Sequence, residues 1–431
     1  MHFSSRILNI FSNFSKFWKT LLCIIILYSC HNKEYNNSGL LVIDVENNVG
    51  NYQLVRLSEI TSEIQYIPLE TSKDCLIGEN HSIYMTEDLL FIWGGDYCYC
   101  FDHNGKFIRP IGNKGRGPGE YTVITEMSFG NQSIYITTSQ KINKYSMDGN
   151  YLYSFDVPLI DGIPLDACMY IGNNNFLGHH HNYSGDAAYN YCLFNESGTI
   201  FKQFPNYIRS TGKNTWSTGE TMMSPYQVDS VLFIKEYHND TLFQLNKGSL
   251  EPRYVFRLGR YAIPAKVRRQ VFQDFMKLPY IFIPRYNTPM VGTSQYLFFS
   301  SVFGDIQPIP DGKRKVFFRG EELEVNFGHF VLGLYDCQSG ITRLLDTDPI
   351  SKMAGLVNDI DGGLSFWPKF YSPKGELIDI WSAEDMKNIL DETYFNYRDI
   401  KDKIAHRNLK NILNNLSEED NPIVVIAKLK R

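Results

Sequence analysis

The sequence lacks the signatures that would assign it a known catalytic or metal-dependent role. No GxSxG, HExxH or EF-hand loop occurs in its 431 residues, and no Cys/Cys or Cys/His spacing is typical of a zinc site. The formal net charge is a mild −5 and no basic stripe stands out, so nucleic acid is not an expected partner. No cofactor is expected. Because carboxylates cannot be paired from sequence alone, a glycosidase-type acid pair is neither indicated nor excluded.

Long hydrophobic runs are also scarce. The apolar run from Leu21 to Tyr28 follows basic residues and is too short to span a bilayer comfortably, which is typical of a signal-peptide core. The run ends in LYSC, which resembles a bacterial lipobox in which Cys30 is lipidated. We therefore predict a signal peptide at 1–29 and a lipidated tether and linker at 30–60. Tyr28 departs from the small or aliphatic residue that usually occupies its position in a lipobox. The alternative interpretation is therefore a plain secretory signal peptide in which Cys30 occurs by chance.

Cysteines are few in the mature chain. Cys23 leaves with the signal peptide and Cys30 takes the lipid, which leaves six of the eight. Cys98 and Cys100 are two residues apart in a predicted strand, where they share one face and are badly placed to bridge each other. Buried free thiols are the favoured state, although an exported protein can form disulfides.

Aromatic residues are abundant, at 14% of the chain, and suit strands more than helices. A strand–turn–strand unit closed by glycine recurs along the chain. The first, CFDHNGKFI, contains an Asn-Gly pair, which readily supplies the positive φ of a tight turn. The turn glycines are Gly105, Gly149, Gly198, Gly248 and Gly340. The first three spacings match a four-stranded propeller blade of roughly 40–50 residues, and the last is about double.

The repeats predict an all-β fold, a six-bladed β-propeller of four-stranded blades spanning 61–431. The C-terminal blade has three strand candidates of its own, and Ile64–Glu70 supplies the fourth, which closes the ring and protects exposed sheet edges. Pro68 suits an outermost strand because it has no backbone donor. Two helical insertions are expected, at about 264–278 and at about 382–417, and the second opens on a capping box at Ser382.

Four phrases of the chain resemble a known family. They are IGNKGRGPGEY after blade one, HNDTLFQL at His238, NDIDGGLSFWP at Asn358, and the ending DNPIVVIAKLK. Together they look like the six-bladed β-propeller lipoproteins of Bacteroides-type bacteria, which are similar to NHL-repeat propellers. The resemblance covers nearly the whole mature chain and implies the fold and an outer-membrane lipoprotein that faces the periplasm or the cell surface. It implies no reaction or catalytic residue, since NHL relatives include binding modules and a lyase.

Three stretches are candidate ligand-binding sites. The crossing loop Gly112–Tyr121 is either a ligand-facing rim or a clasp between blades, and a phosphate-loop role is disfavoured because a strand follows it. The histidine triplet at 179–181 places two imidazoles on one strand face, a spacing that a metal can use but that also occurs on solvated strand edges. An aromatic in the polar loop around Trp216 can stack on a sugar or pack within the loop. The candidate residues are Asn113, Lys114, Arg116, Glu120, His179, His181 and Trp216.

The sequence favours a non-catalytic binding or scaffolding module of the cell envelope. The expected partners are an envelope protein or a glycan, together with the membrane through the lipid. The alternative is a propeller hydrolase or lyase that acts on glycans or peptides at the mouth of the central channel. Convergent carboxylates or histidines at that mouth would discriminate between the two.

Overall fold

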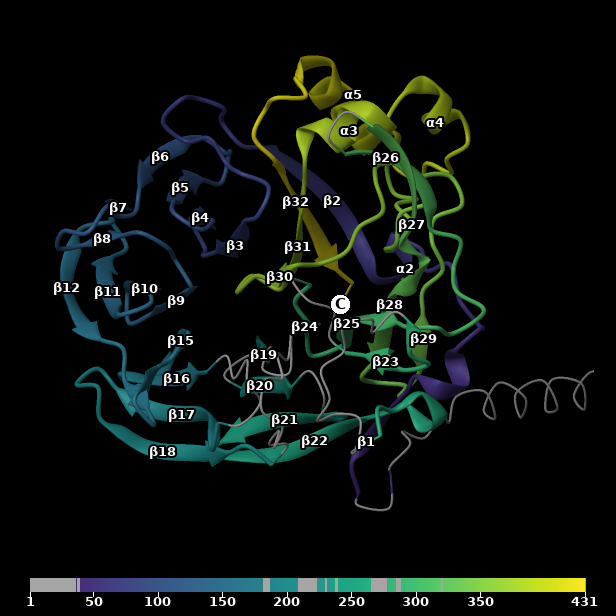
Figure 1. The fold of residues 1–431 in the computed structure, drawn as a ribbon. Helices are drawn as coiled ribbons and strands as arrows, with labels where there is room; N and C mark the ends of the chain where they lie inside the picture. The colour runs from purple at the N-terminus through teal and green to yellow at the C-terminus, as the bar shows by residue number, and fades with distance from the viewer. Residues whose placement is uncertain are drawn as a thin grey trace, which may run out of the picture.

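The strands of the chain form six blades around a common axis in the computed structural model (Figure 1). The structure describes residues 36, 39–180, 187–207, 223–228, 231–236, 239–264, 277–283, 288–318 and 321–430. The predicted signal peptide and Cys30 lie outside this part of the chain, as do His181, Trp216 and most of the helix expected at about 264–278. Among the described helices, none is both long and apolar enough to cross a membrane.

Each of the first three blades is a four-stranded antiparallel sheet that meanders from the axis outward. Blade one contains β3 (Ser82–Met85), β4 (Leu89–Trp93), β5 (Cys98–Asp102) and β6 (Phe107–Pro110). Blade two contains β9 (Glu126–Gly130), β10 (Ser133–Thr137), β11 (Lys141–Ser146) and β12 (Tyr151–Asp156). Blade three contains β15 (Ala167–Gly172), β16 (Asn175–His179), β17 (Tyr189–Asn195) and β18 (Ile200–Pro205).

Blades four to six differ from this pattern because strands from elsewhere in the chain, or divided strands, take part in their sheets. Blade four contains β19 (Met223–Val228), β20 (Val231–Glu236), β21 (Thr241–Asn246), β22 (Ser249–Arg257) and, outside them, β1 (Leu41–Asp44). In blade five the innermost position is divided between β23 (Ile281–Phe282) and β24 (Val291–Gly292), followed by β25 (Tyr296–Phe303), β28 (Phe330–Asp336) and β29 (Thr342–Leu344). Blade six contains β30 (Phe370–Tyr371), β31 (Glu376–Trp381), β32 (Ile423–Leu429) and β2 (Thr61–Pro68).

The predicted closure of the ring is confirmed. β2 is the outermost strand of blade six and pairs antiparallel with β32, with Gln65 opposite Ile426 and Pro68 opposite Ile423. The missing donor of Pro68 costs no ladder hydrogen bond because the outer side of β2 has no strand partner. The predicted turn glycines are also confirmed, since Gly105, Gly149, Gly198, Gly248 and Gly340 all have φ between 76° and 81°.

The predicted linker at 30–60 differs from the structure in its second half. β1 pairs in parallel with β22, and Ile43 and Val45 are fully buried between blades four and five. Further on, Gln53 and Arg56 bridge to Leu345 and Val357 beside blade five, before α2 (Leu57–Ile60) leads into β2. The purple segment in Figure 1 therefore runs along three blades in succession. The apolar residues of 41–60 explain the difference, because they bury more surface in the ring than a solvated tether would.

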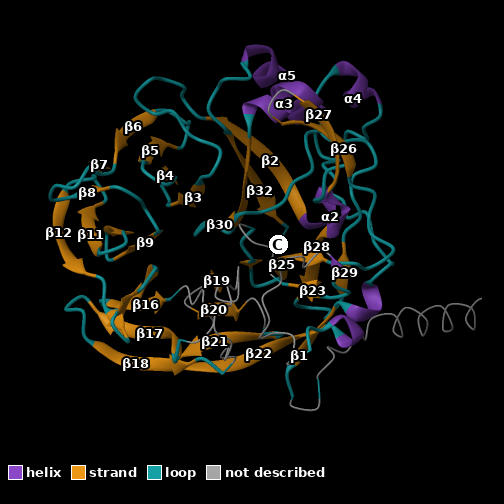
Figure 2. Ribbon diagram, viewed as in Figure 1, coloured by secondary structure: helices purple, strands orange, loops and turns teal. Residues whose placement is uncertain are grey.

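Smaller elements lie in the connections between the strands, both between blades and within them (Figure 2). They are the pair β7 (Asn113–Lys114) and β8 (Glu120–Tyr121), the hairpins β13 (Leu159–Ile160)–β14 (Ile163–Pro164) and β26 (Lys313–Phe318)–β27 (Glu321–Asn326), and 3-10 turns at Glu46–Asn48, Gly259–Tyr261 and Phe327–His329. The expected C-terminal helical segment comprises α3 (Ala383–Ile389), α4 (Glu392–Asn396) and α5 (Lys403–Asn415). Ser382 caps α3, because its Oγ accepts a hydrogen bond from Asp385 N at 3.0 Å.

The core consists of apolar clusters between successive blades. Blades six and one share a cluster that includes Ile67, Leu90 and Val424, and similar clusters fill the other interfaces. The largest joins blades five and six to the three C-terminal helices. The predicted free thiols are confirmed, since none of the six described cysteines is bridged and all but Cys337 are buried.

Candidate functional site

The two faces of the ring differ in their connections. Because the strands of a blade alternate in direction, the turns that join first to second and third to fourth strands share one face, which we call the short-turn face. Its turns are brief, such as 131–132, 147–150 and 173–174. The opposite, loop-rich face carries the long connections 111–125, 345–369 and 382–422, which the structure describes throughout. Binding residues of a rigid scaffold concentrate on such loops, so the loop-rich face is where a ligand site is expected.

The crossing loop Gly112–Tyr121 lies on this face, and most of its side chains hold the loop itself. The Glu120 carboxylate accepts a hydrogen bond from Gly117 N at 2.7 Å and closes over Gly115, where a Cβ would lie 2.0 Å from Glu120 Oε2. Tyr121 OH donates to Ile111 O at 2.8 Å, and Tyr145 OH donates to Gly119 O at 2.9 Å. The contacts of Glu120 and Tyr121 are those of a clasp between blades one and two.

Three other predicted residues of the loop point to solvent. Asn113 and Arg116 are exposed, and Lys114 Nζ forms an exposed ion pair with Asp96 Oδ2 at 2.7 Å. An exposed pair of this kind contributes little to stability, at about 0–1 kcal/mol. These side chains remain available at the rim.

The described histidines of the triplet, His179 and His180, are buried and not on a solvated strand edge, and His181 lies outside the described residues. His179, at the end of β16, is only 3% exposed and its ring stacks on that of Tyr191, with centroids 5.4 Å apart. The next residue, His180, points to the other side, where its Nδ1 lies 3.4 Å from Asp166 Oδ2. The sequence analysis missed this pair because Asp166 precedes a different strand of the blade, β15. Among the described residues, no three His, Cys, Asp or Glu side chains are grouped in a way that could hold a metal ion.

Glu126 is a second carboxylate that sequence reasoning missed. It is the first residue of β9, so it stands at the loop-rich end of the innermost strand of blade two. Its Oε1 accepts a hydrogen bond from Met127 N at 3.0 Å, and no other described group bonds or pairs with the carboxylate. Burial raises the pKa of Glu126 to about 7 despite that hydrogen bond. A strongly shifted carboxyl without an ion-pair partner is typical of a functional position more than of a structural one.

The strand beside β9 brings the two acidic positions close together. Tyr170 N on β15 donates to Ser128 Oγ on β9 at 2.9 Å, which aligns the innermost strands of blades two and three. Burial, followed by the nearby Cys192, Glu126 and Asp166, raises the pKa of Cys168 well above its usual value. Glu126 and Asp166 therefore flank Cys168 on the loop-rich side of these strands.

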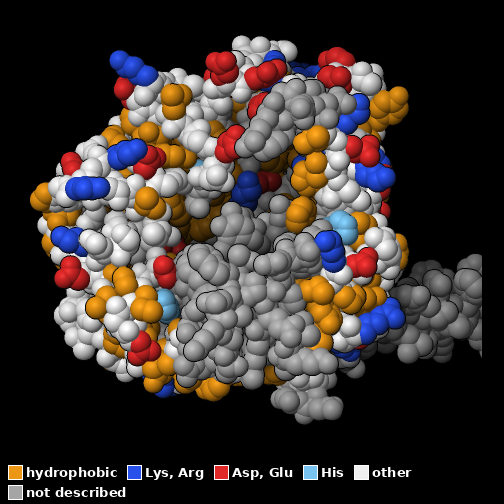
Figure 3. All heavy atoms as spheres, viewed as in Figure 1, with side chains coloured by type: hydrophobic (Ala, Val, Ile, Leu, Met, Phe, Trp, Pro, Cys, Tyr) orange, Lys and Arg blue, Asp and Glu red, His pale blue; other side chains and the backbone are white. Residues whose placement is uncertain are grey.

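Aromatic side chains line the innermost strands of three successive blades. Tyr84 on β3 stacks on Phe129 of β9, with centroids 3.7 Å apart and planes inclined by 5°, and lies 5.0 Å from Phe370 on β30. All three rings are half-buried. Figure 3 shows a hollow near the centre of the ring, with hydrophobic side chains inside it and a basic side chain beside an acidic one at its border. We call Glu126, Asp166 and His180, together with these aromatics, the central site.

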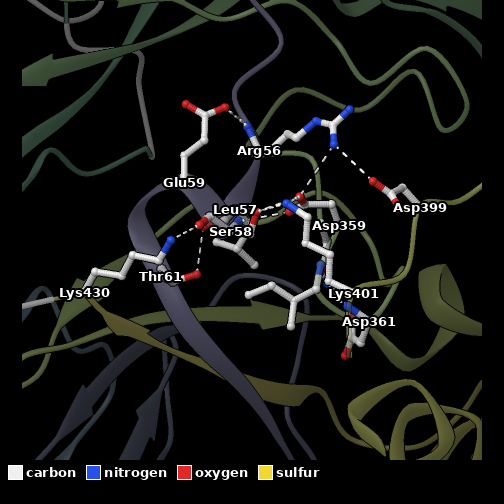
Figure 4. Close-up of polar contacts among 12 residues, drawn as sticks. Arg56, Leu57, Ser58, Glu59, Thr61, Asp359, Asp361, Asp399, Lys401 and Lys430 are labelled. Carbon is white, nitrogen blue, oxygen red and sulfur yellow. Dashed lines mark hydrogen bonds and ion pairs between the residues drawn. The ribbon is translucent and has the colours of Figure 1, made fainter. Parts of the chain in front are cut away.

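A second polar group, centred on Ser58 of α2, resembles a catalytic arrangement at first sight (Figure 4). Ser58 Oγ donates to Asp359 Oδ2 at 2.6 Å, and Lys401 Nζ lies 2.6 Å from Ser58 Oγ and 2.7 Å from Asp359 Oδ2. A Ser–Lys pair needs a neutral amine to act as base, whereas this amine is engaged in an ion pair with a nearly buried carboxylate. Although burial raises it, hydrogen bonds from Lys401 and Ser58 hold the pKa of Asp359 below its usual value.

The Ser58 cluster is therefore a lock on the closed ring. Asp359 follows blade five, Lys401 belongs to the helical segment within blade six, and Lys430, which donates to Ser58 O, follows the last strand. Arg56 adds an ion pair to Asp399 at 3.1 Å. Segments from both ends of the chain and from two blades meet at α2.

Comparisons with known proteins support the fold and leave the activity open. A solved Bacteroides fragilis protein that is described as exported is 18% identical to this chain, with a TM-score of 0.63, and the match covers 90% of this chain and 100% of that one. A member of the DUF4221 family from Bacteroides vulgatus is 10% identical with a TM-score of 0.42, and covers 68% of this chain and 85% of that one. No curated protein matches the chain. The first likeness agrees with the predicted resemblance to propeller proteins of Bacteroides-type bacteria. The family model described as "Domain of unknown function (DUF4934)" matches residues 40–428.

Proposed function

The chain belongs to the DUF4934 family, and from this premise we propose that it is an exported, lipid-anchored β-propeller that acts as a non-catalytic binding module in the cell envelope. The observation that carries the binding role is the asymmetry of the ring. Long connections gather on one face, where the half-buried Glu126 and the Asp166–His180 pair stand at the ends of inner strands. The other face has only brief turns between its described strands.

Export and anchoring rest on the N-terminal sequence and on the likeness to the exported Bacteroides fragilis protein. The short apolar run and the LYSC ending are those of a lipoprotein signal, and Cys30 is separated from β1 by only a short polar segment. A single acyl chain gives marginal membrane binding, whereas a lipoprotein with several chains stays bound.

Replacement of Cys30 tests the anchor. Cys30→Ser should release the protein from the membrane fraction or stall its processing, while Cys23→Ser, within the signal peptide, should leave fractionation unchanged. Mass spectrometry of the mature N-terminus should find acyl chains on Cys30 of the wild type. An unmodified N-terminus together with unchanged fractionation of Cys30→Ser would exclude lipid anchoring.

Site-specific photo-crosslinking tests the binding face. A photoreactive residue at Arg116, which is exposed on the loop-rich face, should give a discrete adduct with an envelope component in living cells. The same residue at Lys247, which is exposed in a turn of the short-turn face, is the matched control and should give none. Adducts from Lys247 alone, or from neither position, would contradict the proposal.

A further inference from the structure

The central site combines two features that single out one kind of ligand. Glu126 offers a carboxylate oxygen that no described group occupies, at the loop-rich end of β9. Phe129, three residues further along the same strand, belongs to the stacked aromatic group with Tyr84 and Phe370. Since an extended strand rises about 3.3 Å per residue, the carboxylate and the aromatic group are separated by roughly 10 Å.

Both Glu126 and Phe129 belong to the innermost strand of blade two and are partly exposed. Glu126 and Phe129 lie on opposite faces of β9, yet both are half-buried, because the inner edge of this strand has no strand partner. Figure 3 shows a hollow near the centre of the ring on the face in view. Along β9, an anionic acceptor at the loop-rich end is therefore followed by the aromatic surfaces.

We propose that the central site binds a small ligand that carries a protonated primary amine on a short arm from a planar ring, with the amine on Glu126 and the ring against Tyr84 and Phe129. This inference rests on the proposed binding function and names the chemistry of its ligand. An ammonium group pairs with the free carboxylate oxygen, and a ring gains stacking contacts at the aromatic group.

The groups around Glu126 leave the ionisation of its carboxyl as the factor that sets affinity for an amine ligand. Cys168 faces it from β15, and Asp166 precedes the same strand, while its partner on β10 is the non-titrating Thr137. The thiol of Cys168 stays protonated at neutral pH because its pKa is raised. With the pKa of Glu126 raised to about 7 by burial, the carboxylate is largely charged at pH 8 and largely neutral at pH 6. Affinity for an amine should therefore be about tenfold higher at pH 8.

Calorimetric titration with 2-phenylethylamine tests the inference, with 2-phenylethanol as the neutral counterpart. The wild type should bind the amine, more tightly at pH 8 than at pH 6, and should bind the alcohol weakly and without dependence on pH. Glu126→Gln should bind the amine at the level of the alcohol at both pH values. Tyr84→Leu should weaken amine binding by a similar factor at both pH values, since it alters the ring contact and leaves the charge.

The matched control is Glu87→Gln, which alters an exposed glutamate in a turn of the short-turn face and should titrate as the wild type does. Thermal unfolding of each variant shows that it is folded before titration. The inference is overturned if the wild type does not distinguish the amine from the alcohol, or if Glu126→Gln retains the amine preference. In either case, a crosslinked adduct from Arg116 on the loop-rich face would still support the proposed binding function. Failure of the amine-binding inference can therefore be distinguished from failure of the proposed function.

Discussion

At the scale of single residues, two carboxylates show how location sets charge. Asp359 is 3% exposed but receives hydrogen bonds from Ser58 and an ion pair from Lys401, and its pKa is lowered. Glu126 lacks such partners, and burial raises its pKa to about 7. The first belongs to a structural lock and the second to an open site. Opposite pH dependences of stability follow from these opposite shifts.

Asp359→Asn should destabilise the protein by about 1–3 kcal/mol at neutral pH, because it removes an ion pair and weakens two hydrogen bonds that hold α2. A folded-state pKa below the unfolded value near 3.9 gives stability that is present above about pH 4 and is lost as pH falls through the lowered pKa. The gap in melting temperature between wild type and variant should therefore narrow in acid. Asp399→Asn, at a pair whose acid is 62% exposed, is the control and should cost less than about 1 kcal/mol. Equal losses in the two variants would contradict the lock.

Glu126→Gln should stabilise the protein at pH 8, by about 1–3 kcal/mol, because it removes a charge that the fold does not compensate. The unfolded state ionises near pH 4.3, so wild-type stability should fall as pH rises from there to about 7, and the variant should lack this decline. Urea unfolding at pH 5 and at pH 8 measures both curves. A variant that is less stable than the wild type at pH 8 would show that Glu126 has a structural partner.

At the scale of elements, the repeated turns provide a matched pair. Gly105 and Gly198 close the outer hairpins of blades one and three with φ of 81° and 78°. A Cβ on Gly198 would meet nothing within 4 Å, whereas one on Gly105 would lie 2.1 Å from Pro68 O on β2. The turn of blade one is thus pressed against the closing strand, and Glu70 N donates to Gly105 O at 2.8 Å.

Gly198→Ala should cost about 1 kcal/mol, the usual penalty for a side chain at positive φ. Gly105→Ala should cost about 1–3 kcal/mol more, because the clash with Pro68 must be relieved by a shift of the turn or of β2. Chemical denaturation of the two variants measures the difference. Equal costs would mean that the turn of blade one does not press on the closing strand.

At the scale of the whole molecule, the N-terminal segment 41–68 contributes to the stability of the closed ring. β1 covers the outer edge of blade four, the stretch around Gln53 lies beside blade five, and β2 completes blade six. Blades one to three have no such cover in the described structure, since β6, β12 and β18 end their sheets. Residues 41–68 therefore connect blades four, five and six to one another.

A series of N-terminal truncations should separate these contributions. A variant that begins at Gly39 should melt as the full mature chain does. A variant that begins at Arg56 loses β1 and the fully buried Ile43 and Val45, and should be less stable by several kcal/mol, at about 1.5–3 kcal/mol for each buried apolar side chain. A variant that begins at Thr71 also loses β2 and should lose cooperative unfolding, because the ring is open. Calorimetry measures all three, and a Thr71 variant that melts like the Gly39 variant would refute closure by β2.

Much of this architecture could be predicted from the residues. Glycine at the five recurring turns, alternating apolar strands and the surplus strand at Ile64–Glu70 are local patterns, and they predicted the six blades and the closure. The N-terminal linker could not be predicted correctly beyond residue 40. The parallel pairing of β1 with β22 joins segments that are far apart in the sequence. The sequence of a four-residue strand does not indicate which strand it pairs with.

The central site depended on tertiary structure even more. The sequence singled out the crossing loop and the histidine triplet, because unusual composition is visible along a chain. Glu126 looks like any other acid in sequence, and its raised pKa comes from the protein packed around it. Asp166 and His180 meet only because β15 and β16 pair side by side. The sequence by itself determined the repeat, the turns and the closure, since these follow from backbone propensity and periodicity; the charge state and the partners of each side chain were decided by which distant segments the closed ring brings into contact.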